Sequence, residues 1–560
     1  MKSKRIISSL IAALVLSTTL VGCASKTSDT SSTSTNKAAE AKLDADQTAN
    51  VLGFDYESLD VDVIDDVESG TTALAVGEGL MREAVVDGKD INVLAGAEKI
   101  DANKDHTVYT FHLKDTKWSD GKAVTAGDYV YGWSRLANPK ISQSYLGFLN
   151  EIGVKGATEA GAANSADLGL KAIDEKTFEV TLAAPSAYFE STLNFSGLFP
   201  VRKDIVEKLG SQYGVDYKNM VFNGAFTLTD YQKGSKLVYT KNDKYWDAKN
   251  VKIKTVNASI VDEPATYNKM FDAKELDAIG GIGDFLIPLQ KKAEAGDIQY
   301  VKGSLPTVFY YIFNAGSKNL SNAKVRQAIS LSYDRKTQID AVWKRNYPAQ
   351  GIIPNKILVG TDEFRKLVPE PLTTIKDDPK KLLADGLAEA GLGSDPSKIT
   401  LNLLMGKATS ASTAQAQFIQ NQLKTNLGLN IKITYSVDSP SYFKARTAGQ
   451  FDLCAGGWGA DYNDVISFFN VFTSTNGNNN GKYKSTDYDA LVAKGKVELD
   501  SKKRLDIFKQ AELLLVAKDA AVSPYFYQDI QSFRQNYLKG FYVPMFGAYY
   551  DLKNIYISGK

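Results

Sequence analysis

The sequence predicts an α/β protein with at least two lobes, and two observations support that prediction. Segments with strand-like alternation are followed by segments with helical periodicity, and residues 400–437 follow a strand, helix, strand order that is typical of parallel pairing. Roughly 500 residues of ordinary globular composition follow a polar leader, which is more than one hydrophobic core can hold. We therefore expect two or three subdomains.

Residues 1–45 precede this globular part and have the features of an export signal followed by a tether. Basic side chains at positions 2, 4 and 5 stand before the apolar run 6–16, which is too short for a permanent transmembrane helix. The letters LVGC at 20–23 resemble a bacterial lipobox, which implies a signal peptide over 1–22 and lipid on Cys23. An ordinary signal peptide with a chance cysteine is the alternative. Residues 23–45 are rich in Ser, Thr and charge and predict a flexible tether.

The residue inventory argues against several classes of function. With 66 basic and 65 acidic residues, the chain lacks the basic excess that a nucleic-acid surface needs. His106 and His112 are the two histidines, and a strand would hold them roughly 20 Å apart, too far to share a zinc ion. The sequence contains no GxSxG, Walker or HExxH motif. Cys454 lies in an alternating apolar run, which favours a buried, inert thiol over a nucleophile.

The first half of the globular part is predicted to contain strands and one capped helix. A short strand near residue 50 precedes an acidic loop, and alternation over 108–113 predicts a second strand. After a turn at Asp120 and Gly121, a capping box of Thr125 with Asp128 starts a helix that runs to about residue 136. Residues 171–182 alternate as one strand, and 223–248 predict a hairpin with its tip at 233–235.

The second half alternates strands with helices. A strand around 308–313 leads to a helix for which Asn322 is the expected N-cap, with Arg326 and Arg335 off its buried face. That face would hold Val325, Ala328, Ile329 and Ser332. The βαβ stretch 400–437 follows.

Six segments, taken in order, resemble the oligopeptide-binding proteins of bacterial ABC importers, in the peptide and nickel branch of extracellular solute-binding proteins. They are YTFHLKDTKWSDGKAVTAGDYVYGW, KAIDEKTFEVTLAAPSAYF, NGAFTL, KYWDAKNVKI, VRQAISLSYDR and GWGADYND, and they cover nearly all of the chain after the tether. The resemblance implies an α/β, periplasmic-binding-protein-like, two-lobed clamshell (type II) of three domains. Domain I would comprise residues 46–77, 202–306 and 528–560, domain II residues 78–201, and domain III, the opposite lobe, residues 307–527.

The stretch GGWGADYND at 456–464 is the leading candidate for a ligand site. Its glycines let a ligand backbone approach closely, Trp458 offers a flat apolar wall, and Asp461 supplies a fixed negative charge. Every free peptide carries an α-ammonium group, and a carboxylate in a closing cleft can pair with it. By resemblance, Asp461 anchors the peptide amino terminus. A turn or capping aspartate is the alternative that the residues alone favour.

The resemblance implies that the rest of the peptide is held through its main chain as an added strand. It assigns these contacts to Asp65, Asp66 and Val67 in one lobe and to Ala455, Gly456, Gly457 and Trp458 in the other. Tyr145 matches a tyrosine that contacts the peptide. Roomy side-chain pockets would make specificity loose. Val465 stands where many relatives have proline, and no clear counterpart of the basic residues that hold a peptide carboxyl terminus is found.

The function implied is that of a lipid-anchored receptor, expected to be monomeric, that captures oligopeptides and delivers them to an ABC permease. No cofactor, metal or catalytic residue is implied, and a Gram-positive cell surface is favoured over a periplasm. One alternative is the same fold with another solute, such as a nickel chelate, haem, an oligosaccharide or a signalling peptide. A secreted glycosidase with paired carboxylates is the other, and bond cleavage would be its signature.

Overall fold

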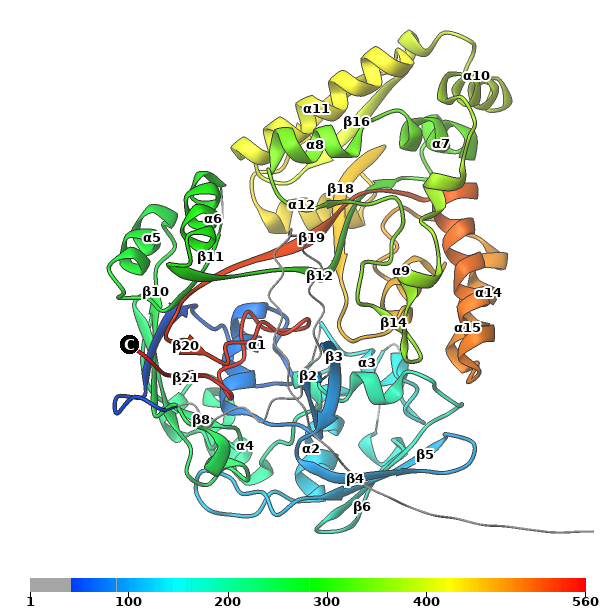
Figure 1. Ribbon diagram of the computed structural model, residues 1–560. Coiled ribbons are helices and arrows are strands. Elements are labelled where there is room, and N and C mark those ends of the chain that lie inside the picture. The colour runs from blue at the N-terminus through cyan, green and yellow to red at the C-terminus, as the bar shows by residue number, and fades with distance from the viewer. Residues whose placement is uncertain (1–41, 87, 143, 159, 163, 282) are drawn as a thin grey trace, which may run out of the picture. The chain divides into compact units, whose positions relative to one another are not determined.

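The computed structural model describes residues 42–560 except 87, 143, 159, 163 and 282 (Figure 1). The expected signal peptide, Cys23 and most of the tether lie outside the described residues. Residues 43–560 form one unit, to which the following description applies. Among the described residues, no helix combines the length and the apolar character that crossing a membrane would require.

An 11-stranded sheet organises this unit, in the order β17-β16-β18-β12-β19-β11-β1-β10-β9-β8, with β13 paired to β19. Two long antiparallel strands, β12 (Ile298–Phe313) and β19 (Val522–Gln535), run through its middle (Figure 1). Their pairing shifts register between Ser304 and Val308, so the ladder is interrupted there. The two strands thereby join the β8–β11 half of the sheet to the β16–β18 half.

The first half of the sheet contains the predicted hairpin and the predicted first strand. The hairpin, β8 (Phe226–Gln232) and β9 (Lys236–Lys241), turns where expected, and β1 (Thr48–Gly53) pairs in parallel with β10 (Thr255–Ile260). Alternate residues of these strands are buried in one core, as a period of two requires. The other elements of this half are β11 (Ala278–Gly280), α1 (Val67–Val76), α4 (Lys203–Leu209), α5 (Pro264–Asp272), α6 (Leu286–Glu294), β20 (Leu538–Lys539) and β21 (Tyr556–Ile557).

A separate four-stranded sheet, β4-β5-β7-β6, packs against α2 (Ala126–Leu136). The expected strand is β5 (Val108–Leu113), and the backbone N–H of Thr125 donates to Asp128 in the expected capping box. The prediction of one strand over 171–182 is wrong, because β6 (Leu170–Asp174) and β7 (Thr177–Thr181) form a hairpin. Asp174 accepts a hydrogen bond from the N–H of Lys176 and so makes the turn without glycine or proline. The edge strand β4 spans Ala97–Ala102, and β2 (Met81–Val86) and β3 (Lys89–Leu94) form a two-stranded sheet of their own.

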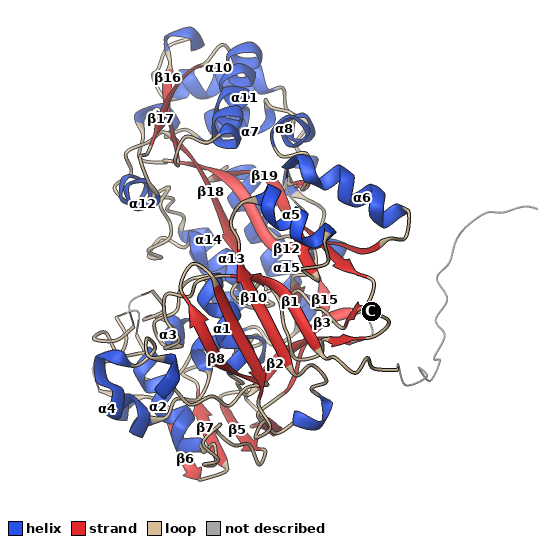
Figure 2. Ribbon diagram, turned by 90° about the vertical axis from the view of Figure 1, so that its left-hand side faces the viewer, coloured by secondary structure: helices blue, strands red, loops and turns tan. Residues whose placement is uncertain are grey.

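The other end of the large sheet contains the predicted βαβ unit. Strands β16 (Thr400–Met405) and β17 (Asn430–Tyr435) pair in parallel around α11 (Ser410–Leu427). Figure 2 shows α7 (Ala323–Leu331), α8 (Arg335–Val342) and α10 (Pro379–Glu389) gathered near them. Asn322 caps α7 as expected. Arg326 and Arg335 are nevertheless buried, because the guanidinium group of each donates hydrogen bonds to buried backbone carbonyls, which satisfies its polar atoms.

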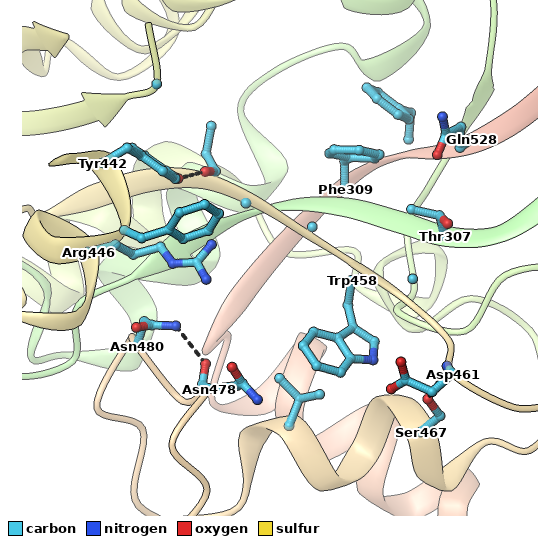
Figure 3. Close-up of a pocket in the computed structure, with 18 of the residues that line it drawn as sticks. Thr307, Phe309, Tyr442, Arg446, Trp458, Asp461, Ser467, Asn478, Asn480 and Gln528 are labelled. Atoms are coloured by element: carbon cyan, nitrogen blue, oxygen red, sulfur yellow. Dashed lines mark hydrogen bonds between the residues drawn. The ribbon is translucent and has the colours of Figure 1, made fainter. Parts of the chain in front are cut away.

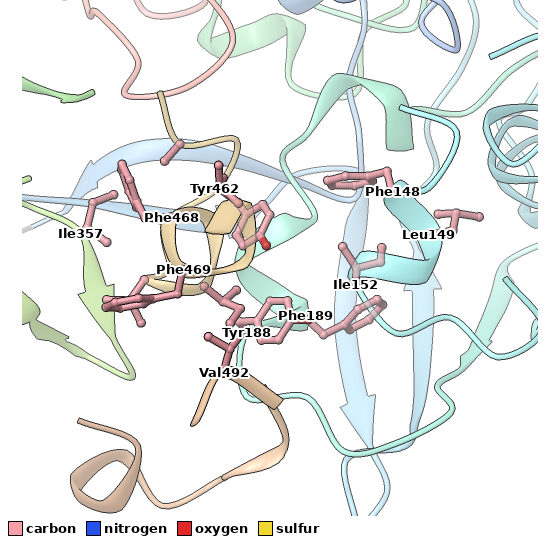
Figure 4. Packing of buried hydrophobic residues seen from close by; sticks show 14 of the residues in the cluster. Phe148, Leu149, Ile152, Tyr188, Phe189, Ile357, Tyr462, Phe468, Phe469 and Val492 are labelled. Carbon is pink, nitrogen blue, oxygen red and sulfur yellow. The ribbon is translucent and has the colours of Figure 1, made fainter. Parts of the chain in front are cut away.

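A core of aromatic and aliphatic side chains connects residues 148–198 with residues 349–516. Figure 4 shows part of it, with Tyr462 between Phe148 and Tyr188 on one side and Phe468 and Phe469 on the other. The Tyr462 ring stacks on Tyr188 at 5.8 Å between centroids. The elements around this core are α3 (Phe148–Glu151), β14 (Leu358–Val359), β15 (Asp362–Glu363), α9 (Phe364–Leu367), α12 (Ser439–Thr447), α13 (Ile466–Phe469), α14 (Thr486–Val497) and α15 (Ser501–Glu512). Two further strands, β18 (Leu453–Gly459) and β13 (Tyr347–Pro348), belong to the large sheet.

Candidate functional site

A cavity of about 1520 Å³ lies beside strand β18 (Figure 3). Typical small-ligand pockets occupy roughly 300–1,000 Å³, so this cavity suits a longer ligand. Its wall combines residues 144–151, strands β12, β18 and β19, helix α12 and the loop 470–480. Segments that are hundreds of residues apart in sequence thus face one space.

Strand β18 presents an unpaired edge to this cavity. Along one edge it pairs with β12 from Leu453 to Gly459, whereas β16 pairs on the other edge with Leu453 and Cys454 alone. Among the described residues, no strand continues that second edge past Cys454. The Tyr442 hydroxyl donates to the Ala455 carbonyl, which therefore points off the edge. Because main-chain groups alternate in direction along a strand, those of Gly457 and Gly459 point the same way and can receive an extended chain.

The glycines of this strand have a packing role that the sequence did not indicate. A Cβ atom on Gly456 would lie 2.8 Å from Ile312 Cδ1, and one on Gly457 would lie 2.8 Å from Phe309 Cδ1. Side chains of β12 therefore occupy the space beside these two glycines. The sequence predicts the approach of a ligand backbone at these glycines, and the structure adds the close approach of β12 side chains.

Asp461 follows β18 and places its carboxylate in the cavity wall. Its backbone N–H donates to Ser467 Oγ at 3.1 Å, and its Oδ1 accepts from the Tyr145 hydroxyl at 3.1 Å. Burial and, to a smaller extent, the charge of Glu151 raise the pKa of Asp461 to about 7, against the lowering effect of the Tyr145 hydrogen bond. No lysine or arginine of the described residues pairs with it. The carboxylate is therefore poorly compensated until a cation arrives.

Tyr145 and Trp458 flank this carboxylate from different directions. The Tyr145 ring packs on that of Phe195, with 4.7 Å between the centroids, which fixes the Tyr145 hydroxyl toward Asp461. The charge of Asp461 and burial raise the pKa of Tyr145 well above its usual range. The indole ring of Trp458 lines the cavity, and its buried N–H has no hydrogen-bond partner among the described residues. An unsatisfied indole N–H is available to a ligand oxygen.

The structure separates the members of the 65–67 segment. Asp65 lines the cavity and accepts a hydrogen bond from the Ser144 hydroxyl. Asp66 instead caps helix α1 by accepting from the N–H of Ser69 at 2.6 Å, and Val67 is the first residue of that helix. Neither Asp66 nor Val67 is among the lining residues. Ala455, Gly456, Gly457, Trp458, Tyr145 and Asp461 line the cavity together with Asp65.

The described residues contain one group that could hold a metal ion, formed by Glu57, Asp65 and Asp66. Two of these side chains are exposed and Asp66 is engaged as a helix cap, so the group has a structural explanation. The histidines have separate partners: His106 lies 3.4 Å from the Tyr109 hydroxyl, and His112 lies 3.0 Å from Asp101 Oδ2. Cys454 is buried as predicted, and burial raises the pKa of its thiol to about 12.

The sequence reasoning missed the basic side chain of this cavity. Arg446 lies on α12 and stacks over the ring of Phe443 at 4.9 Å and that of Tyr442 at 5.7 Å. Among the described residues it has no ion-pair partner, whereas Arg345, the other basic lining residue, pairs with Asp529 at 2.9 Å. The available signal was the spacing of Tyr442, Phe443 and Arg446, which puts the arginine one helical turn from both rings.

Comparisons with known proteins identify the family of this chain. The family model of bacterial extracellular solute-binding proteins, family 5 (middle region), matches residues 93–480. The periplasmic oligopeptide-binding protein OppA of Escherichia coli K12 is 32% identical over 481 residues, which are 85% of this chain and 86% of that protein.

Two solved structures are similar over 92% of this chain and 100% of their own. One is the substrate-binding domain of an oligopeptide ABC transporter from Bacillus anthracis, with a TM-score of 0.75 and 28% identity. The other is Listeria monocytogenes OppA bound to peptide, with a TM-score of 0.74 and 30% identity. The predicted periplasmic-binding-protein-like α/β fold is thereby confirmed. The relatives are substrate-binding proteins and not enzymes, which excludes the glycosidase alternative. The chain therefore belongs to the bacterial extracellular solute-binding proteins, family 5.

Proposed function

We propose that this protein is a lipid-anchored receptor outside the bacterial cell membrane, which captures oligopeptides in the cavity beside β18 and delivers them to an ABC permease. One observation carries the ligand assignment: within the part of the chain that the structure describes, a strand edge without a partner strand ends at a carboxylate without a cationic partner. A free peptide has both complementary features, an extended main chain and an α-ammonium group at one end. The relatives include oligopeptide-binding proteins, which supports the same ligand class.

Asp461 would bind the α-ammonium group of the peptide. Burial and the neighbouring Glu151 disfavour its ionised form in the empty cavity. An ammonium group compensates this negative charge, so binding should lower the pKa of Asp461 and release a proton near neutral pH. The Tyr145 hydroxyl holds Asp461 Oδ1 in place. Because every free peptide has this ammonium group, the contact fixes the position of a peptide without reading its sequence.

The peptide main chain would extend the sheet along β18. The N–H and C=O groups of Gly457 and Gly459 point off the unpaired edge and would form ladder hydrogen bonds with it. Ala455 already accepts from Tyr442, so we expect the ladder to end there. Arg446, stacked beside Tyr442, offers a positive charge at that end of the strand to a peptide carboxylate.

The three-domain division expected from the sequence is part of the proposal. Its boundaries at 306/307 and 527/528 fall in β12 and β19, where the pairing shifts register between Ser304 and Val308. A bulge in a two-strand connection is a suitable place for bending, because fewer ladder hydrogen bonds resist it there. Closure of 307–527 onto 78–201 would bring Asp461 to Tyr145 and Tyr462 to Glu151, two contacts present in this structure.

The lipid anchor is proposed from the lipobox-like letters at 20–23 and the polar tether that follows. Such an anchor would hold a monomeric receptor beside a membrane permease, at a Gram-positive surface rather than free in a periplasm. Labelling of cells with a palmitate analogue should mark the wild-type protein and leave a Cys23→Ser variant unmarked. Equal labelling of both would refute the anchor.

Calorimetry tests the ligand assignment. A free-amine peptide should bind the wild-type protein, and N-acetylation should weaken binding by about 2–5 kcal/mol, because the carboxylate then lacks its partner. Asp461→Asn should remove most of this difference, while the control Asp487→Asn, an exposed aspartate in the first turn of α14, should retain it. Equal affinity of the wild-type protein for both peptides would contradict the assignment. Native mass spectrometry that shows one non-peptide adduct would transfer the function to another solute.

A further inference from the structure

The unpaired edge of β18 lies between two faces of the sheet that differ in chemistry. Phe309 is directly opposite Gly457, and Val308 is directly opposite Trp458, so the side chains of these two pairs point to opposite faces. Figure 3 shows Phe309 and Trp458 on opposite sides of the strand. The core clusters agree, because Phe309 packs against one cluster and Trp458 against another.

One face forms what we call the aromatic chamber. Phe309 packs on Phe526 at 4.6 Å between ring centroids, and Trp343 packs on Phe526 at the same distance. Phe309 and Trp343 remain half-buried and border the cavity, so a ligand can cover their exposed area. Its apolar members are Phe309, Val342, Trp343, Met405, Tyr525 and Phe526, and the polar Gln415, which contacts Tyr525, also borders the cavity.

The other face forms what we call the asparagine chamber. It is bordered by Trp458 and by the loop 470–480, which contributes four asparagines, Asn470, Asn476, Asn478 and Asn480, to the cavity wall. Asn480 Nδ2 donates to the Asn478 carbonyl at 2.8 Å, which holds this part of the loop in place. Figure 3 shows Asn478 and Asn480 on the same side of β18 as Trp458. Amide groups suit polar side chains, since each offers donors and an acceptor.

A peptide added to β18 must alternate its side chains between these two chambers, because side chains of successive strand residues point to opposite faces. We propose that the cavity therefore selects peptides by alternation: side chains of one parity enter the aromatic chamber, and those of the other parity enter the asparagine chamber. The preferred ligands are free-amine peptides with a large apolar side chain at every second position and a small or polar one between. This inference rests on the proposed binding of peptides as an added strand.

A substitution series in a pentaalanine peptide tests the proposal. Phe replaces Ala at positions 2, 3, 4 and 5 in turn, and calorimetry gives each dissociation constant for the wild-type protein. Phe of one parity should bind roughly 10- to 100-fold more tightly than Ala, the factor expected for burying a phenyl ring, and Phe of the other parity should not. A gain at every position alike, or at none, would overturn the proposal.

Variants of the protein locate the effect. Phe309→Ala should reduce the ratio of Phe to Ala affinity at the favoured parity, and Phe309→Leu, which keeps apolar contact, should restore part of it. Asn478→Ala is the matched change in the opposite chamber and should leave that ratio as in the wild-type protein. If Asn478→Ala lost the tighter binding of Phe peptides over Ala peptides and Phe309→Ala kept it, the assignment of the chambers would be contradicted. Thermal melts show that each variant is folded.

Pentaalanine with a free or an acetylated amine separates this proposal from the broader one. If free pentaalanine binds and acetylation weakens it, peptide capture at Asp461 holds whatever the Phe series shows. If neither form binds and no Phe peptide binds, the proposed function itself fails.

Discussion

The protonation of Asp461 should make peptide affinity depend on pH in a predictable way. In the empty cavity its pKa is about 7, and binding of an ammonium group requires the ionised carboxylate. The peptide amine has a pKa of roughly 7.7–8.0 and must be protonated. Affinity should therefore be highest between these two values, near pH 7.4, and fall on both sides.

The expected loss follows from the fractions of each group in its binding form. At pH 7.5 about three quarters of Asp461 is ionised and about two thirds of the amine is protonated, whereas at pH 5.5 about 3% of the carboxyl is ionised. The product of the two fractions, and with it the peptide affinity, falls roughly 15-fold from pH 7.5 to pH 5.5, which corresponds to about 1.6 kcal/mol of binding free energy. Since the bound carboxylate stays ionised, each binding event at pH 6 should release about 0.9 proton.

Calorimetry in two buffers of different ionisation enthalpy measures both the affinity and the proton release. Asp461→Asn should show weak binding with no loss from pH 7.5 to 5.5, because the amide does not titrate there. Equal wild-type affinity at pH 5.5 and 7.5, or no proton release at pH 6, would refute the reasoning. An acetylated peptide serves as the second control, since it lacks the ammonium group.

Three further predictions concern stability and ligand release. Because the pKa of Asp461 is raised in the folded state, ionisation of its carboxyl group lowers the free energy of unfolding as pH rises toward 7. Asp461→Asn should therefore raise the Tm of the ligand-free protein at pH 8 and change it little at pH 4. An unchanged Tm at pH 8 would contradict this. Lys356→Met removes an ion pair of 2.7 Å between this lysine and the β2–β3 hairpin. In stopped-flow assays it should speed peptide release up to roughly fivefold. The control Lys366→Met removes an ion pair between residues three positions apart in sequence and should leave the release rate unchanged. Gly457→Ala should lower the free energy of unfolding in urea by about 1–3 kcal/mol, because the added Cβ would lie 2.8 Å from an aromatic ring of β12. The control Gly477→Ala places its Cβ in open space and should leave the free energy of unfolding unchanged. Equal urea midpoints for the two alanine variants would count against that packing argument.

Much of the local structure could be predicted from the chain. The strand at 108–113, the capping box at Thr125, the hairpin at 226–241 and the βαβ unit each depend on residues close together in sequence, and each is present. The hairpin at 170–181 was missed because an aspartate side chain, rather than glycine or proline, forms its turn. The burial of Arg326 was missed because its carbonyl partners include Ala520, far away in the sequence.

The sequence was sufficient for the features that depend on residue chemistry alone: the polar leader, the absence of a basic excess, and a carboxylate beside a tryptophan and three glycines. Tertiary structure was needed for everything that depends on partners. The free edge of β18 exists because β16 stops pairing at Cys454, and the pKa of Asp461 depends on Glu151, which lies 310 residues earlier in the chain. Burial, like-charge repulsion and an unpaired edge are properties of neighbours in space, and no local pattern in the chain encodes which neighbours these are.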